Sequence, residues 1–248
     1  MSYLKSMTFF ITLCIIIELL LEIGGASPAA FAKPSEILFE LHLFVDPSEH
    51  FIDAVYTTLR SLFAFFISLP LGLLIGALVQ KSLFCKGELK GLVDFFRSVP
   101  GTTLVPLFFV IFGIGEASKV ASAIYGGALA VAISVIIGLQ QISDERKYSV
   151  TAMYSNEFVG FWRFEFLEIL PTALVGFRTA LSLSLVLVTV AEMFMGSSSG
   201  LGSLIIDSRY AGNVPLLYSS IFVTGVIGFL MNNVASKIEA RVLYFYRK

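Results

Sequence analysis

Six long apolar runs constrain the fold of this chain more than any other feature of its sequence. They lie at Met7–Ile23, Val55–Val79, Ser98–Gly115, Lys119–Leu139, Ala173–Met195 and Val214–Ala235. A helix of about 20 apolar residues is long enough to cross the hydrocarbon core of a bilayer. With 56% hydrophobic residues, 14% charged residues and a mean hydropathy of +0.86, the chain is too apolar for an ordinary soluble domain. The runs therefore predict an all-α, polytopic membrane protein with six transmembrane helices.

The distribution of basic residues over the connecting loops predicts the orientation of the chain. If the N-terminus is cytoplasmic, eleven Lys and Arg residues lie on the inner side and only Lys33, Lys119 and Arg209 lie on the outer side. Cytoplasmic loops carry such an excess of Lys and Arg. The remaining arginines fall near span ends, where long side chains can extend to the interface: Arg60, Arg97 and Arg178. We therefore expect both termini to be cytoplasmic.

The first run, Met7–Ile23, allows two interpretations. Glu18 and Glu22 interrupt it, which favours a retained membrane helix over a secretory signal. The alternative is a signal peptide, because a basic residue precedes the run and the sequence SPAAFAKP after it contains an Ala-x-Ala cleavage pattern. We expect the retained helix, and a mature chain that starts at Lys33 would establish the signal peptide.

The inner loop 140–171 is the longest and most charged connection. Its segment Val150–Ile169 has no proline and one glycine, which predicts a helix. Four aromatic side chains recur there at helical spacing and would share one face: Tyr154, Phe158, Phe161 and Trp162. Leu170-Pro171 then predicts a break before the fifth span. Such a helix either lies on the inner leaflet or docks its aromatic face in a groove of a cytoplasmic partner.

The third run raises a different question because it contains two prolines. Proline inside a span removes a backbone hydrogen bond, and in lipid the freed carbonyl needs a partner from protein or water. Pro100 and Pro106, with Thr102 and Thr103 between them, therefore predict a kinked helix that lines a translocation path. A packing kink without function is the alternative.

Glycines have two roles in the predicted spans. Gly113 and Gly115 allow a sharp turn at the outer surface, with Glu116 exposed beside them. In the second span, Gly72 and Gly76 form a GxxxG pattern that permits close helix packing.

At this point the chain resembles a known family, the permease subunits of ABC importers, in the branch that serves nitrate, taurine and alkanesulfonates. Three pieces carry the resemblance: LVDFFRSVPGTTLVPLFFVIFGIGEASK (Leu92–Lys119), EILP (Glu168–Pro171) and VAEMFMGSSSGLGSLI (Val190–Ile205). The similarity extends over Pro34–Arg241. It implies a type I ABC importer permease (MetI-like) fold, a second permease copy as a homodimer, two ATPase subunits and an external solute-binding protein.

The resemblance also implies that loop 140–171 couples the permease to the ATPase. The residues implied in coupling are Tyr154, Phe158, Gly160, Phe161, Trp162, Leu170 and Pro171. The family pattern of Glu-Ala-Ala, three residues and Gly is not kept, because Ala152, Met153 and Tyr154 stand at the first positions and Phe158 at the glycine. Only Leu-Pro matches, unless Gly160 serves as the glycine after a small shift. We therefore expect coupling contacts adapted to an unusual ATPase surface.

Glu192 lies near the outer end of the fifth span. An ionisable group inside a span is costly, so its side chain should face the bundle interior or the path. A hydrogen bond to a backbone turn and a contact with solute are both compatible with this position. An ionised carboxylate would repel an anionic solute, which favours the structural role. The resemblance further implies that Gly200 and Gly202 belong to an outer loop.

Two other functions are compatible with parts of the sequence. Gly-x-Ser-x-Gly around Ser198 matches the nucleophile pattern of hydrolases, although it follows a membrane helix rather than a strand. A self-sufficient secondary carrier or channel is the other alternative, but such carriers often have charged pairs near the bilayer midplane, which are nearly absent here.

We therefore expect the chain to be the inner-membrane permease subunit of an ATP-driven importer for a small solute, an anion such as nitrate, taurine or an alkanesulfonate. It would form one permease domain over residues 1–248, with a core at 34–241. The chain has no GxxxxGK[ST] motif and no Cys/His cluster, so we expect no catalytic residue, metal or cofactor, and ATP hydrolysis by a partner chain.

Overall fold

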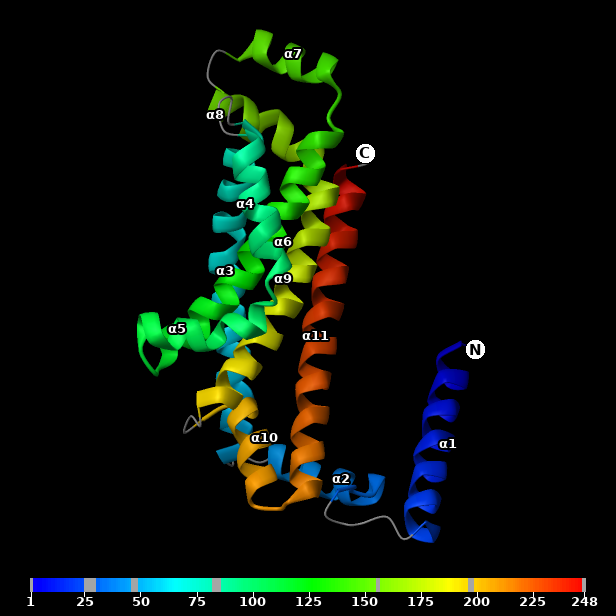
Figure 1. The fold of residues 1–248 in the computed structure, drawn as a ribbon. Helices are drawn as coiled ribbons and strands as arrows, with labels where there is room; N and C mark the ends of the chain where they lie inside the picture. The colour runs from blue at the N-terminus through cyan, green and yellow to red at the C-terminus, as the bar shows by residue number, and fades with distance from the viewer. Residues whose placement is uncertain are drawn as a thin grey trace. The chain divides into compact units, whose positions relative to one another are not determined.

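The structure is a computed structural model, and it describes residues 2–24, 30–45, 49–81, 86–154, 157–195 and 199–246. Within these residues every regular element is a helix, which confirms the all-α prediction (Figure 1). The helices are α1 (Ser2–Ile23), α2 (Pro34–Glu40), the 3-10 turn η1 (Leu41–Phe44), α3 (Glu49–Lys81), α4 (Lys86–Ser98), the 3-10 turn η2 (Gly101–Leu104), α5 (Val105–Phe112), α6 (Glu116–Gln141), α7 (Asp144–Met153), α8 (Glu157–Gly160), the π-helical turn η3 (Phe161–Glu165), α9 (Phe166–Met195), α10 (Leu201–Tyr210) and α11 (Val214–Tyr246).

Four helices of the described residues are long and apolar enough to cross a membrane, and they are α3, α6, α9 and α11. Each contains one of the predicted runs. The first run forms α1, which is not among these four helices. A fifth span is reached if α4 and α5 count as one bent pair. The multi-pass prediction is confirmed, and the described residues provide four of the six predicted spans, or five with the bent pair.

The third predicted span is broken rather than kinked. α4 ends at Ser98, the chain passes through Pro100 and η2, and α5 leaves at 86° to α4 (Figure 1). Pro100 lies before η2, where it lacks helical dihedrals, and Pro106 lies in the first turn of α5, where its missing N–H costs nothing. The Thr103 N–H and hydroxyl both donate to the Pro100 carbonyl, at 3.0 and 2.7 Å, and stabilise the turn. The predicted kink is therefore a break between two helices, and no single helix covers Ser98–Gly115.

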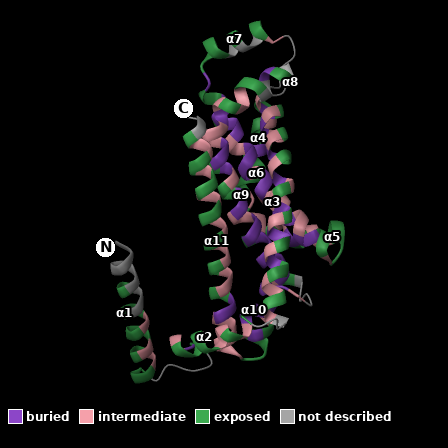
Figure 2. Ribbon diagram, turned by 180° about the vertical axis from the view of Figure 1, so that it is seen from behind, coloured by how far each residue is buried: buried purple, intermediate pink, exposed green. Residues whose placement is uncertain are grey.

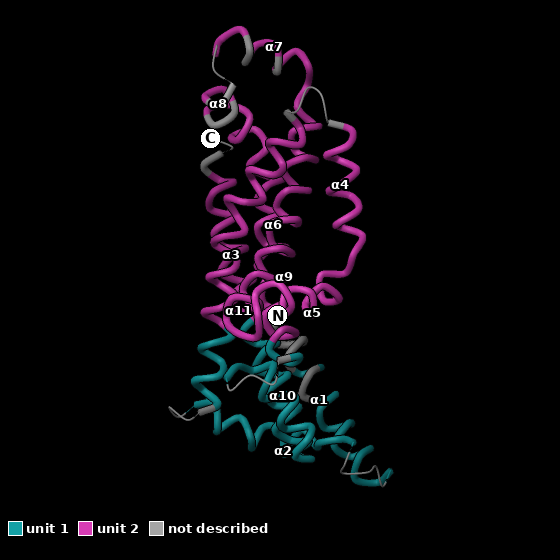
Figure 3. Tube along the Cα trace, turned by 60° about the vertical axis from the view of Figure 1, so that its left-hand side comes forward, with its two compact units in different colours: residues 1–57, 192–227 teal, residues 58–191, 228–248 magenta. Residues whose placement is uncertain are grey.

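The chain divides into two compact units (Figure 3). Residues 58–191 and 228–248 form the larger unit, and residues 1–57 and 192–227 form the smaller one. α3, α9 and α11 contribute residues to both.

The core of the larger unit lies where α3, α6 and α9 pack together (Figure 2). Val131, Val135 and Leu139 of α6 are buried there with Ile169 of α9. A Cβ on Gly72 would lie 2.5 Å from Cβ of Val131, and a Cβ on Gly76 would lie 2.7 Å from Cβ of Val135. The GxxxG pattern therefore does what its sequence predicts, because the missing side chains let α3 contact α6 closely.

The smaller unit is built around Phe44, Leu201 and Leu204, with side chains of α11 packed against them. α1 is joined to the start of α2 by polar contacts. The Ser35 hydroxyl and N–H donate to the Glu18 carboxylate at 2.5 and 3.0 Å, and Lys33 lies 3.6 Å from Glu22. The two glutamates that interrupt the first run thus have partners beyond it.

Loop 140–171 departs from its predicted helix in two places. α7 ends at Met153, Tyr154 is not helical, and helical structure resumes at Glu157, so Tyr154 does not share a helix with the other three aromatic residues. The predicted residues Ser155 and Asn156 lie outside the described residues. Pro171 does not end a helix but lies inside α9. Neighbouring helices let a membrane helix keep an internal proline, and Pro171 is flanked by Ile169 and Ala173, both buried.

Candidate functional sites

Glu192 is fully buried in the smaller unit and holds the start of α10. Its Oε2 accepts a hydrogen bond from the Thr57 hydroxyl at 2.8 Å and another from the Gly202 N–H at 3.0 Å. The first N–H groups of a helix have no partner within that helix, and a carboxylate beside them is favourable. Glu192 therefore caps α10 from within the protein.

Two further side chains of α3 complete this cap. The Thr57 Oγ1 also accepts from the Leu201 N–H at 2.8 Å, and the Asp53 Oδ1 accepts from the Gly200 N–H at 2.6 Å. Gly200 adopts φ +122°, a conformation that side chains other than glycine rarely adopt. A Cβ there would lie 2.4 Å from Cδ of Glu192. Glycine at position 200 is thus required both by its backbone and by the carboxylate beside it.

The start of α6 in the larger unit carries three charged residues in contact. The Arg60 guanidinium donates to Glu116 through Nε at 2.5 Å and Nη2 at 2.7 Å, and the Lys119 Nζ donates to the same carboxylate at 2.9 Å. Arg60 is 7% exposed and Lys119 is 2% exposed, whereas the Glu116 side chain is 63% exposed. The Arg60 guanidinium thus lies at the start of α6, where the exposed carboxylate of Glu116 holds it. These three residues together carry a charge of +1.

The other predicted outer-loop residues lie at the ends of helices. Gly113 ends α5 with φ +77°, and Gly115 precedes α6 with extended backbone dihedrals. Gly202 is buried in the first turn of α10. Ser198, on which the hydrolase alternative depends, lies outside the described residues.

A cavity of about 500 Å³ lies at the break between α4 and α5, against α6 and α9. Pro100 and Thr102 line it, whereas Thr103 and Pro106 are exposed and are not among its lining residues. Its remaining polar lining comes from Arg97 and from hydroxyl-bearing side chains: Tyr125, Ser134 and Thr179. The structure thus brings together two of the predicted path residues with polar side chains that sequence reasoning did not connect with them.

The predicted coupling residues occupy the end of the larger unit where α7 and α8 lie. Phe158 and Gly160 belong to α8, Phe161 and Trp162 to η3, and Leu170 and Pro171 to α9. The Tyr154 ring contacts that of Phe164 at a centroid distance of 5.6 Å.

Two contacts tie this segment to the membrane helices. Ile169 is 1% exposed and lies against Gly138 of α6, where a Cβ would be 2.9 Å from the Ile169 Cβ. Arg146 of α7 forms an ion pair with Glu168 of α9. The ion pair thus joins α7 to the start of α9, and Ile169 joins the start of α9 to α6.

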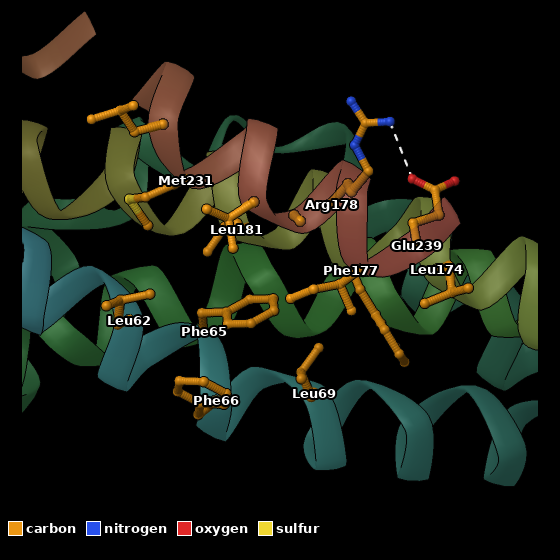
Figure 4. A pocket seen from close by; sticks show the side chains of 14 residues that line it. Leu62, Phe65, Phe66, Leu69, Leu174, Phe177, Arg178, Leu181, Met231 and Glu239 are labelled. Atoms are coloured by element: carbon orange, nitrogen blue, oxygen red, sulfur yellow. Dashed lines mark hydrogen bonds and ion pairs between the residues drawn. The ribbon is translucent and has the colours of Figure 1, made fainter. Parts of the chain in front are cut away.

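A groove of about 540 Å³ runs between α3, α9 and α11 of the larger unit (Figure 4). Its lining is almost entirely apolar, with Phe65, Phe177 and Leu181 prominent, and the Arg178–Glu239 ion pair at 3.2 Å is its only charged feature among the described residues. This lining offers a polar solute almost no hydrogen-bond partners, so we do not assign the groove to transport.

Sequence reasoning missed Asp53, Thr57 and the cavity role of Arg97. Asp53 and Thr57 precede their partners by 135 residues or more, and nothing local in the sequence signals the contact. Arg97 was visible as a charge next to the two prolines, but it was assigned to a span end.

Comparison with known proteins identifies the family. The chain is 26% identical over 226 residues to a Bacillus subtilis protein assigned as the aliphatic sulfonates transport permease SsuC, which covers 89% of this chain and 80% of the relative. It is 24% identical over 211 residues to the taurine transport system permease protein TauC of Escherichia coli, covering 83% and 76%, respectively. It is 24% identical over 250 residues to the formylaminopyrimidine transport permease protein ThiX of Halalkalibacterium halodurans, covering 99% and 97%.

A chain of the inward-facing MetNI methionine ABC transporter has the same fold, with a TM-score of 0.67 at 18% identity over 86% of this chain and 99% of that one. This confirms the predicted fold class. Residues 68–244 match the family described as the inner membrane component of binding-protein-dependent transport systems. That match spans well over half of the sequence and shows that the chain belongs to this family, the ABC importer permeases.

Proposed function

We propose that this permease serves an importer for a small anionic solute of the sulfonate class, and that it works with separate ATPase subunits and an external binding protein. The similarity to the sulfonate permease over 226 residues carries the choice of solute class. The taurine permease supports it, because taurine is also a sulfonate. As a member of its family the chain is a transport subunit and not an enzyme.

The ATPase docks on the segment formed by α7, α8 and η3 in this proposal. Tyr148 and Met153 of α7 are 76% and 65% exposed, and large apolar side chains with such exposure favour a partner surface. The contacts of Ile169 and Glu168 give the docked ATPase a rigid connection to α6 and α9. The C-terminal end of α11 lies at the same end of the larger unit (Figures 1 and 3), which supports a cytoplasmic C-terminus.

The solute path includes the cavity at Pro100 and Thr102, and two copies of the chain enclose it as a homodimer. The binding protein docks on the outer loops, which include Gly113, Gly115 and Glu116 and also Gly200 and Gly202. The whole of residues 1–248 acts as one permease domain, with its core at 34–241 and both termini cytoplasmic.

Copurification and uptake together test the proposal. The tagged chain, extracted in mild detergent from its own membrane, should bring down an ATPase in equal amount, and cells that contain the complete transporter should accumulate labelled taurine or ethanesulfonate. Recovery of the chain alone, together with solute uptake by that chain in liposomes, would instead establish a secondary carrier.

The docking segment has its own test. Replacement of Phe158 and Trp162 by alanine should weaken ATPase binding by about 30-fold or more, since a buried aromatic anchor contributes about 2–4 kcal/mol. Tyr210, an exposed aromatic residue of α10 outside the segment, is the matched control, and Tyr210→Ala should leave binding unchanged. Equal ATPase recovery with the double variant and the control would contradict the assignment.

A further inference from the structure

α4 has three different faces. Leu89 and Val93 pack against Val79 of α3 and Ile136 of α6. Leu92 and Phe95 form a second, exposed apolar face.

The third face of α4 is charged. Lys90, Asp94 and Arg97 follow one another at i, i+4 and i+7, so they lie on one side of the helix, and all three are exposed. α4 therefore has one side for each environment. One apolar side packs against protein, the exposed apolar side suits lipid, and the charged side suits water.

The charged face lies within the depth of the membrane helices. The Tyr125 hydroxyl donates to the Phe96 carbonyl at 3.0 Å, so the end of α4 lies beside the tenth residue of α6. At 1.5 Å per residue, that point is about 14 Å from the start of α6 and about 24 Å from its end. Arg97 therefore lies far from either end of this span, and its assignment to a span end is wrong. An ionisable side chain at this depth faces water or a binding site rather than lipid.

Arg97 lines the cavity at the α4–α5 break with its guanidinium uncommitted. It makes no side-chain hydrogen bond or ion pair with another residue in the part of the chain that the structure describes. The hydroxyls of Thr102 and Ser134, on the same cavity, are likewise without such a partner there. Tyr125 and Thr179 donate their hydroxyl protons to backbone carbonyls. One cationic and two hydroxyl-bearing side chains without such partners thus line a space of about 500 Å³.

We propose that Arg97 is the specificity-determining residue of the translocation path, that its guanidinium binds the anionic group of the solute in transit, and that Lys90 and Asp94 line the water-filled approach. Guanidinium presents N–H groups in a fixed fork that matches two oxygens of a sulfonate or carboxylate. The Thr102 and Ser134 hydroxyls donate to the remaining oxygens. The proposal rests on the proposed function and assigns its solute selectivity to named side chains.

Water access to the charged face is the first test. In a chain with Cys14→Ser and Cys85→Ser, single cysteines replace Lys90 or Asp94 on the charged face and Leu92 or Phe95 on the apolar face. The complete transporter in lipid nanodiscs is treated with a charged methanethiosulfonate reagent. Cysteines at 90 and 94 should react at least tenfold faster than those at 92 and 95. Equal rates at all four positions would overturn the assignment of the charged face to the path.

The charge of Arg97 can be measured apart from transport. Thr102→Cys serves as a reporter in the cavity and is labelled with an anionic and a cationic methanethiosulfonate of similar size. A unit charge about 7 Å away in water changes the local concentration of each monovalent reagent about 2.7-fold in opposite directions. Arg97→Gln should therefore lower the ratio of anionic to cationic rates about sevenfold, while Arg97→Lys keeps it. An unchanged ratio in Arg97→Gln would show that the guanidinium does not face the cavity.

Uptake then separates this proposal from the proposed function. Cells with the wild-type transporter should take up labelled ethanesulfonate, Arg97→Gln should reduce uptake at least tenfold at equal membrane abundance, and Lys237→Gln, at an exposed cation of α11, should not reduce it. No uptake by the wild type would reject the sulfonate class. Wild-type uptake that persists in Arg97→Gln would reject the role of Arg97 and leave the proposed function standing.

Discussion

Substitution of Gly200 by alanine should destabilise the smaller unit strongly. The backbone at this position has φ +122°, and a residue held in such a sparsely populated region costs about 1–3 kcal/mol. The new methyl group would also lie 2.5 and 2.6 Å from the two carboxylate oxygens of Glu192. The carboxylate must move, and each hydrogen bond to a charged group that it loses costs about 1.5–3 kcal/mol. The sum is about 3–6 kcal/mol.

Thermal unfolding of the purified chain in detergent, followed by loss of helical circular dichroism, measures the effect. One kcal/mol corresponds to about 2–4 °C in Tm for a chain of this size. Gly200→Ala should therefore lower Tm by about 6–24 °C.

Two glycines of the same chain separate backbone strain from the contact with Glu192. Gly212 has φ +72° and nothing within 4 Å of an added Cβ, so Gly212→Ala carries the backbone term of about 1–2 kcal/mol alone. Gly115 has extended dihedrals and the same open space, so Gly115→Ala should be within about 0.5 kcal/mol of wild type. Equal losses in Gly200→Ala and Gly212→Ala would refute the role assigned to the Glu192 contact. In a Glu192→Ala background, Gly200→Ala should cost no more than Gly212→Ala does.

Two further substitutions test helix packing in the membrane core. Gly72→Ala would bring a methyl group within 2.6 Å of the Ala128 carbonyl oxygen. It should lower Tm in the same assay, because overpacking costs about 1–3 kcal/mol. Gly225→Ala is the control: an added Cβ has no atom within 4 Å, so Tm should rise slightly through the better helix propensity of alanine. Asn232→Leu should lower the stability of the chain by about 0.6 kcal/mol and at most by about 1.7, since it removes the interhelical hydrogen bond of 2.9 Å to Ser182. If the double variant Ser182→Ala/Asn232→Leu is no less stable than either single variant, that bond is the cause. Additive losses of stability would exclude it.

The sequence predicted the parts of the fold that hydropathy decides. The runs at Val55–Val79, Lys119–Leu139, Ala173–Met195 and Val214–Ala235 each became part of a long helix because about 20 apolar residues have few alternatives in a membrane protein. The GxxxG pattern at Gly72 also predicted a close helix contact, because two glycines four residues apart always lie on the same face of a helix.

The effect of proline on its helix was the feature that the sequence predicted least well. Pro100 and Pro171 were both expected to interrupt helical structure within or before a span, yet Pro100 separates two helices at 86° and Pro171 leaves α9 continuous. The difference lies in what surrounds each residue. Gly101 follows Pro100 and the Thr103 side chain stabilises the resulting turn, whereas buried neighbours on both sides of Pro171 keep its helix together. The burial of those neighbours comes from packing against other helices, which no window of the sequence contains.

The break at Pro100 also explains why the path residue was missed. If Ser98–Gly115 were one straight span, Arg97 would stand just before it, at the membrane surface, where a cation needs no partner. Because the chain instead bends beside Tyr125, the helix that precedes the break lies along the middle of α6, and its last turn brings Arg97 to that depth. The same cation thereby changes from an interfacial anchor into a charge at membrane depth, where it needs water or an anion. The helix break at Pro100 and Gly101 thus places Arg97, which the sequence alone assigns to a span end, where its guanidinium can bind the anionic group of the solute.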